Sequence, residues 1–178
     1  PYAGRRFFAP ECHRPYGNGD GRTYAQGASS KHNVDFISVR DYHINPCIGC
    51  NSCFKRDDQS CIQKDDMQTV YDKLAKADML VVASPVYFYG ISSQLKALID
   101  RCHNPLRDSF KIKKVALLLV GAATLPELFD SILVQYRLCI NYFHLEDCGK
   151  ILVRGVKEKG DIKNTNALKE AFSLGASI

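Results

Sequence analysis

The sequence predicts a doubly wound α/β fold, in which helices cover both faces of a parallel β-sheet. From residue 34 onward, short β-branched stretches alternate with stretches whose apolar residues recur at helical spacing. Two strand candidates, residues 79–88 and 115–123, are apolar almost throughout, as expected for strands that helices bury on both sides. This regular alternation of strands and helices is typical of a single α/β sheet.

Four strands and four helices are predicted from these patterns. The strand candidates are residues 34–39, 79–88, 115–123 and 150–156. The helix candidates are residues 65–77, 92–102, 125–143 and 165–175. Ser92 or Ser93 is the expected N-cap of the second helix, and Gly175 is expected to end the last one. With 178 residues and no repeats, we expect one domain spanning residues 1–178.

Residues 1–30 fit this pattern poorly. They are rich in glycine and arginine, their apolar core is limited to residues 7–9, and residues 22–30 offer only a short helix candidate. A doubly wound sheet normally opens with a buried strand and a tight loop that leads into a helix. Periodicity alone therefore predicts no first strand here.

The composition argues against a membrane or nucleic-acid partner. No run of about 18 apolar residues occurs, and the first residues show no features of a secretory leader, so we expect a cytoplasmic location. The formal net charge is +5, but the basic residues are scattered among acidic ones rather than gathered in one block. We therefore expect a mildly basic surface that would tolerate an anionic cofactor.

The segment "ASPVYFYG", residues 83–90, follows a buried strand and is a candidate ligand site. In open α/β sheets, ligands bind beyond the carboxyl ends of the strands. Ser84 offers a hydroxyl group, Tyr87 and Phe88 offer flat faces to a planar ring, and Gly90 is expected to let the chain turn. The alternative is that the aromatic side chains pack under the next helix. The small residues of "GAAT", residues 121–124, end the next strand and would let a ligand approach main-chain N–H groups.

The segment "PCIGCNSCFKRDDQSC", residues 46–61, holds four cysteines in a short stretch, within a predicted cysteine-rich loop of residues 45–62. Thiolates spaced by two residues can surround an iron-sulfur cluster, and a fourth thiolate completes the coordination. Zinc is a weaker alternative because its sites normally use two separate pairs of ligands. A disulfide does not suit a reducing compartment. Four reduced thiols without a metal remain the other alternative.

Three segments together resemble the NAD(P)H-dependent FMN reductase and iron-sulfur flavoprotein family: "INPCIGCNSCF", "DDMQTVYDKLAKADMLVVASPVYFYGISSQLKALIDR" and "GDIKNTNALKEAFSLG". The resemblance covers residues 33–178. It implies a flavodoxin-like fold with five parallel strands in the order 2-1-3-4-5 and FMN at their carboxyl edge. By matching position, the flavin would be lined by Ser84, Pro85, Val86, Tyr87 and Phe88 and flanked by Gly121, Ala122 and Ala123. The compact cysteine motif implies a [4Fe-4S] cluster held by Cys47, Cys50, Cys53 and Cys61.

The N-terminal part departs from the family pattern. The family holds the FMN phosphate with a Gly-Ser-Pro-Arg stretch followed by Gly-Asn-Thr, whereas only Pro10 and the Gly17-Asn18 pair are similar to it here. The spacing between Pro10 and the strand at residue 34 still suits a loop, a helix and a second strand. Arg14 or Arg22 would be the residues to compensate for the lost phosphate contacts.

The resemblance implies a flavin enzyme that passes electrons from NAD(P)H, or from a ferredoxin-like donor, to a small-molecule acceptor. Flavin can accept one or two electrons, so no side-chain acid or base is obligatory and no catalytic residue is assigned. A flavodoxin-like electron carrier without turnover of its own is the alternative, and a zinc-stabilised α/β protein is a third hypothesis. Family members usually form dimers or tetramers, so we expect a homo-oligomer.

Overall fold

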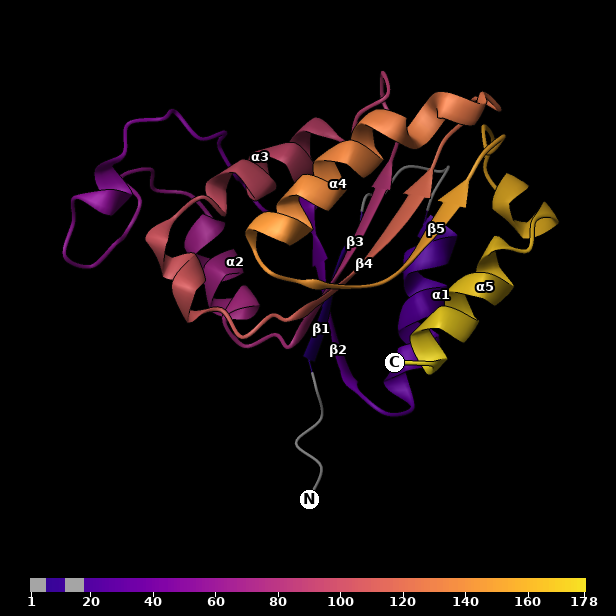
Figure 1. The fold of residues 1–178 in the computed structure, drawn as a ribbon, viewed down its shortest axis with the longest axis horizontal. Coiled ribbons are helices and arrows are strands. Elements are labelled where there is room, and N and C mark those ends of the chain that lie inside the picture. Colours follow the sequence, from indigo (N-terminus) through magenta and orange to yellow (C-terminus); the bar gives the residue numbers. More distant parts are fainter. Residues whose placement is uncertain (1–5, 12–17) are drawn as a thin grey trace.

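The structure is a computed structural model that describes residues 6–11 and 18–178, with side chains from residue 22 onward. The described residues form a sheet of five parallel strands in the order β2-β1-β3-β4-β5 (Figure 1). The strands are β1 (Arg6–Glu11), β2 (Asn33–Ser38), β3 (Met79–Pro85), β4 (Lys114–Val120) and β5 (Glu146–Val153). The predicted flavodoxin-like α/β class is confirmed.

Five helices cover the two faces of this sheet. They are α1 (Asn18–Ser29), α2 (Met67–Leu74), α3 (Ser93–Arg101), α4 (Asp130–Tyr142) and α5 (Ala167–Ala176). Helices α1 and α5 lie side by side on one face, and α2, α3 and α4 cover the other (Figure 1). Among the described residues, no helix is both long enough and apolar enough to cross a bilayer.

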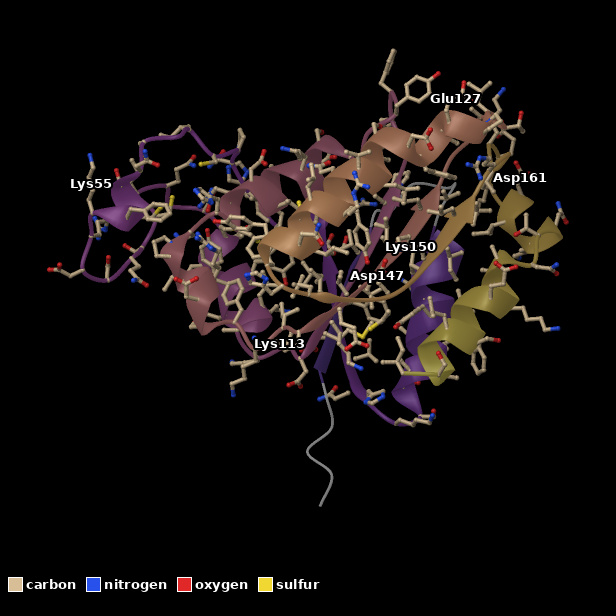
Figure 2. All side chains as sticks on the ribbon, in the orientation of Figure 1. Lys55, Lys113, Glu127, Asp147, Lys150 and Asp161 are labelled. Carbon is tan, nitrogen blue, oxygen red and sulfur yellow. The ribbon has the colours of Figure 1, made fainter. Side chains whose placement is uncertain are left out.

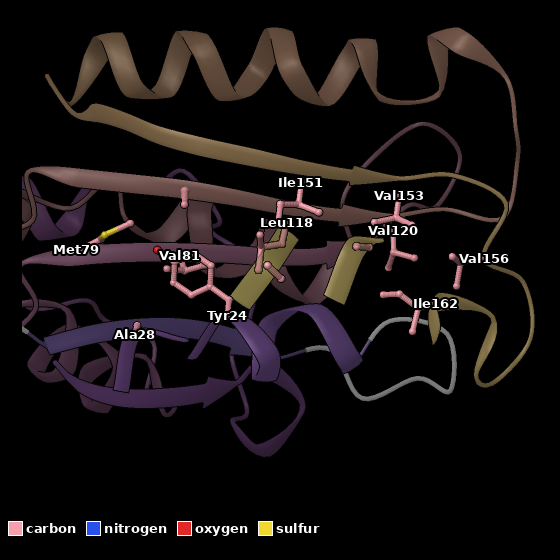
Figure 3. Packing of buried hydrophobic residues seen from close by; sticks show 13 residues of the cluster. Tyr24, Ala28, Met79, Val81, Leu118, Val120, Ile151, Val153, Val156 and Ile162 are labelled. Carbon is pink, nitrogen blue, oxygen red and sulfur yellow. The ribbon is translucent and has the colours of Figure 1, made fainter. Parts of the chain in front are cut away.

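The position of β4 between helices on both faces explains why its sequence is apolar almost throughout. Its alternate residues Ala116, Leu118 and Val120 pack against the α1 and α5 side, where Tyr24 and Ala171 are buried (Figure 3). The residues between them, including Leu117 and Leu119, pack under α4. Side chains in a strand point alternately to the two faces, so a strand with helices on both sides needs apolar residues at every position.

The first strand is present although periodicity did not predict it. β1 lies between β2 and β3, and its register with β2 runs from Arg6 to Glu11. Its pairing with β3 is confined to Phe7 and Phe8, before Pro10 is reached. Proline cannot donate a ladder hydrogen bond, and a proline in a central strand argues against that assignment. The one-sided pairing beyond Phe8 accommodates it.

The predicted end of the last helix is wrong. Gly175 lies inside α5, which continues to Ala176. A side chain at Gly175 would overlap the backbone oxygen of Tyr24 in α1, and one at Gly27 would overlap the backbone oxygen of Phe172 in α5. These two glycines therefore serve the close approach of α1 and α5. By contrast, Ser92 is confirmed as the N-cap of α3, where its side chain accepts a hydrogen bond from Leu95 N.

Candidate functional site

The carboxyl ends of β3 and β4 lie next to each other and bring the two predicted ligand segments together. Val86, just beyond β3, donates its N–H to the backbone oxygen of Val120 at 2.9 Å. Gly121, just beyond β4, donates its N–H to Val153 of β5, also at 2.9 Å. Residues 84–88 and 121–123 therefore occupy one edge of the sheet, where α/β folds bind their ligands.

A tight hairpin displays the aromatic residues of the first segment. Tyr87 and Gly90 exchange two backbone hydrogen bonds, of 2.8 and 2.9 Å. Between them, Phe88 and Tyr89 both take left-handed backbone conformations, with φ of 47° and 61°. The expected turn at Gly90 is present, but the positive φ angles fall on Phe88 and Tyr89 rather than on the glycine. Two successive left-handed positions define a type I′ turn, in which asparagine and glycine are favoured and bulky residues are strained.

The three aromatic side chains of this hairpin do not pack under the next helix. Tyr87 and Tyr89 are each more than two-fifths exposed, and Phe88 is fully exposed. The hydroxyl of Ser131 in α4 donates a hydrogen bond to the backbone oxygen of Tyr89, which steadies the turn. The hairpin thus presents flat apolar surfaces at the ligand edge of the sheet, at a cost in backbone strain that is typical of functional sites.

Ser84 occupies a different position from the aromatic residues. It is only 4% exposed, and its hydroxyl accepts a hydrogen bond from Ser92 N at 3.0 Å. The same hydroxyl donates to the backbone oxygen of Pro85 at 2.8 Å. Ser84 therefore ties the end of β3 to the beginning of α3, and its hydroxyl group is engaged within the chain.

The second segment owes its small first residue to packing. A side chain at Gly121 would overlap Leu128 and would lie 3.5 Å from Val86 Cβ. Ala122 is exposed and Ala123 is half-buried, so both remain accessible at the edge of the sheet. Glycine is therefore needed at position 121 for the close contact between this loop and its neighbours, whatever binds above it.

Arg154 holds this loop from the side of β5, and the sequence analysis missed it. Its guanidinium donates to the backbone oxygens of Leu125 and Pro126, at 2.9 and 2.5 Å. It also lies 4.7 Å from the ring centroid of Phe129, a cation–π distance. Residue 154 falls within the predicted strand of residues 150–156, whereas β5 ends at Val153, so the sequence pattern did not mark it as a loop contact.

The cysteine-rich loop projects beside α2 and α3, away from the aromatic hairpin (Figure 1). Lys55 lies at its outer end (Figure 2). Cys47 and Cys50 are exposed and Cys53 and Cys61 are half-buried; all described cysteines are free thiols. Gly49 makes a turn between the first two cysteines, with a positive φ of 67°.

The loop gives its thiols different acidities. The side chain and the backbone N–H of Ser52 donate to Cys50 and lower the pKa of this thiol, and Lys55 lowers it further. Burial raises the pKa of Cys53, and the nearby thiols of Cys61 and Cys47 add to the effect. The cysteines are thus close enough to influence one another electrostatically. Four soft thiolate donors suit an iron-sulfur cluster chemically. Within the described part of the chain, however, no three metal-ligating side chains are arranged around a common point.

Comparison with known proteins identifies the family. The sequence model of the NADPH-dependent FMN reductase family matches residues 21–131. An iron-sulfur flavoprotein of Methanocaldococcus jannaschii, MJ1083, is 44% identical over 156 residues, which cover 82% of this chain and 78% of that protein. The chain belongs to the FMN reductase family. It is therefore an NAD(P)H-dependent flavoprotein oxidoreductase of this family's type.

Two further likenesses agree with this family membership. An iron-sulfur flavoprotein of Methanosarcina thermophila is 38% identical over 90 residues, which cover 51% of this chain and 44% of that protein. The solved structure of an NAD(P)H:quinone oxidoreductase from Methanothermobacter marburgensis superposes with a TM-score of 0.74. The superposition covers 97% of this chain and 98% of that one. Because the sequence identity is only 12%, this likeness supports the flavodoxin-like fold alone.

The two N-terminal candidates lie near the end of β1 and at the start of α1. Pro10 is near the carboxyl end of β1, in register with Ile37 of β2, and Asn18 is the first residue of α1. The prediction for Arg14 lies outside the described residues. Arg22 is exposed on α1. The family match begins at residue 21. Strand β1 and the first residues of α1 thus have their expected places in the fold, although their sequence departs from the family pattern.

Proposed function

We propose that this FMN reductase family member binds FMN at the carboxyl edge of β3 and β4. The single observation that supports this site is the contact between the two loops, since Val86 N donates to Val120 O directly beside Gly121. The flavin would lie between two sets of residues: Pro85, Val86, Tyr87 and Phe88 on one side, with Ser84 supporting them from within, and Gly121, Ala122 and Ala123 on the other. Pro10 and Asn18 would lie near its phosphate.

The residues of this edge suit a planar ring that carries polar atoms. The exposed faces of Tyr87 and Phe88 can stack on the ring. The small side chains of Ala122 and Ala123 leave backbone N–H groups approachable for ring oxygens. When bound, FMN supplies the one- and two-electron chemistry itself, and the protein positions it and controls solvent access. Electrons would come from NAD(P)H or a ferredoxin-like donor and pass to a small-molecule acceptor.

A single substitution tests this site. Replacing Ala122 with tryptophan fills the exposed edge without entering the core, so we expect FMN affinity to fall by at least about tenfold, or about 1.4 kcal/mol. The matched control is Lys76→Trp, which adds the same side chain at an exposed position just before the amino end of β3, at the opposite end of that strand. FMN titration followed by flavin fluorescence measures both. Equal affinities in the two variants would contradict the proposed site.

We further propose that Cys47, Cys50, Cys53 and Cys61 hold a [4Fe-4S] cluster. The donor set and the names of the relatives support it. Protein purified without oxygen should then contain iron and show broad iron-sulfur absorbance. Cys50→Ser should lose both, whereas Cys148→Ser, which changes a thiol on β5 outside the loop, should keep them. One zinc per chain, or four reactive thiols without metal, would contradict the cluster.

We also propose that the protein forms a homo-oligomer in a reducing, cytoplasmic compartment. The free thiols support the compartment, because structural disulfides are rare there. The exposed hairpin residues Tyr87, Phe88 and Tyr89 support an interface at the flavin edge, since exposed aromatic clusters commonly mark interaction surfaces. Sedimentation that shows only monomers would contradict the oligomer.

A further inference from the structure

The cysteine-rich loop, predicted for residues 45–62, spans residues 46–64 in the structure, and both of its ends meet one buried ion pair. Asn45 precedes the loop and Asp65 follows it, and Asp65 Oδ2 accepts the N–H of Asn45 at 2.9 Å. Arg101, at the end of α3, donates from Nη1 to both partners, at 2.9 Å to Asn45 O and 2.8 Å to Asp65 Oδ2. One guanidinium thus joins the two ends of the loop. We call these three residues the neck.

The ion pair of the neck is buried, and both of its side chains are hydrogen-bonded. The side chains of Arg101 and Asp65 are 3% and 1% exposed. Burial alone would raise the pKa of Asp65, but hydrogen bonds from Arg101 and from the N–H groups of Asn45 and Met67 outweigh it and lower the pKa. The backbone oxygen of Arg101 accepts the hydroxyl of Tyr71 at 2.6 Å. The pair is therefore charged, and neither partner can be removed without leaving a buried charge unpaired.

The residues that follow Arg101 contact the outer part of the same loop. The buried side chain of Asn104 donates to the backbone oxygen of Gln59 at 3.2 Å. The ring of His103 lies 5.5 Å from the ring of Phe54, next to Cys53. The end of α3 and the residues after it therefore contact the loop both at the neck and near the short 3₁₀ helix of Ser52–Phe54.

We propose that Arg101 is the positioning residue of the cysteine-rich loop: it closes the neck and so holds together the two ends of the loop, which carry Cys47 and Cys61. The loop can fold around a metal centre with a smaller loss of conformational freedom because its ends are already joined. The closure of the neck does not depend on the proposed cluster.

The closure is tested in reduced, metal-free protein by hydrogen exchange. Arg101→Gln should speed exchange of the amides in residues 46–64 by about tenfold or more while those of β4 stay protected. Arg101→Lys keeps the positive charge but loses the planar guanidinium that bonds to two partners at once. Its loop amides should therefore exchange at a rate between those of Arg101→Gln and wild type. The matched control is Lys96→Gln, which removes an exposed ion pair with Asp100 on the same helix and should leave the loop unchanged. Loop exchange equal to wild type in Arg101→Gln would overturn the inference.

Loss of protection in β4 would show that Arg101→Gln has unfolded. The double variant Asp65→Asn with Arg101→Gln then serves instead, because it leaves no unpaired buried charge. In this double variant the loop amides should exchange faster than in wild type while those of β4 stay protected. Loop amides as protected as in wild type would again contradict the closure of the neck by Arg101.

Discussion

Replacing Ser84 with alanine separates a structural role of this side chain from a role in contacting the flavin. Its hydroxyl is buried and joins β3 to α3 through Ser92 N at 3.0 Å, and it also donates to the backbone oxygen of Pro85. Ser92 in turn caps α3, so the hydroxyl of Ser84 supports the residue that begins this helix. The substitution leaves the N–H of Ser92 without a partner in a site that is 1% exposed.

The expected cost follows from that single unsatisfied group. A buried donor that loses its partner costs about 1–3 kcal/mol. The free energy of unfolding should therefore fall by about this amount in Ser84→Ala, both with and without FMN. The matched control, Ser93→Ala, changes an exposed serine whose hydroxyl donates to Gln94 Oε1, and its effect should stay within about 0.5 kcal/mol.

Urea unfolding of both variants, combined with FMN titration, distinguishes the two roles. We expect Ser84→Ala to lose stability and to keep an FMN affinity within about threefold of wild type, well under the tenfold that 1.4 kcal/mol represents. Unchanged stability together with a loss of FMN affinity of more than about tenfold would refute the reasoning, because it would show that the hydroxyl contacts the flavin.

Three further predictions follow from the contacts described above. Gly175→Ala should lower the free energy of unfolding by about 1–3 kcal/mol because its side chain meets the backbone of Tyr24; urea unfolding measures this, and a neutral effect would contradict the close approach. In reduced, metal-free protein, Cys50 should alkylate fastest because its pKa is lowered, and Cys102 slowest because burial raises its pKa to about 12. Peptide mass spectrometry gives the order, and the reverse order would be inconsistent with these pKa shifts. The folded pKa of Asp65 lies below its unfolded value of about 3.9, so its stabilisation is present above that pH and is lost as the pH falls through the folded pKa. The free energy of unfolding should therefore fall less steeply with decreasing pH in Asp65→Asn than in wild type. Parallel curves of the two proteins would contradict the charged neck.

The sheet and most helices could be predicted because their signals are local. Strand β4 is apolar at every position, and this alone indicates burial on both faces. The N-cap of α3 is likewise a property of neighbouring residues. Strand β1 was not predicted because its proline, Pro10, and the charged residues at its ends are typical of a loop. Only its pairing partners, which lie far along the chain, reveal it as a strand.

The candidate site was predictable in outline but not in its internal contacts. Sequence order places residues 84–88 and 121–123 after two strands, and adjacency then follows from the fold. The left-handed conformations of Phe88 and Tyr89 could not be predicted, because the closure of the hairpin imposes them against local preference. The contacts of Arg101 with Asn45 and Asp65 join residues distant in sequence, which no periodic pattern reports.

Anaerobic mixing of the FMN-loaded protein with NADPH, without any partner protein, tests the central claim most directly. If the carboxyl edge of β3 and β4 holds a flavin that this chain reduces itself, the yellow flavin absorbance should bleach within the mixing experiment, and Ala122→Trp should bleach far less. A wild-type flavin that binds but keeps its absorbance with both NADPH and NADH would contradict the account and would indicate an electron carrier without turnover of its own.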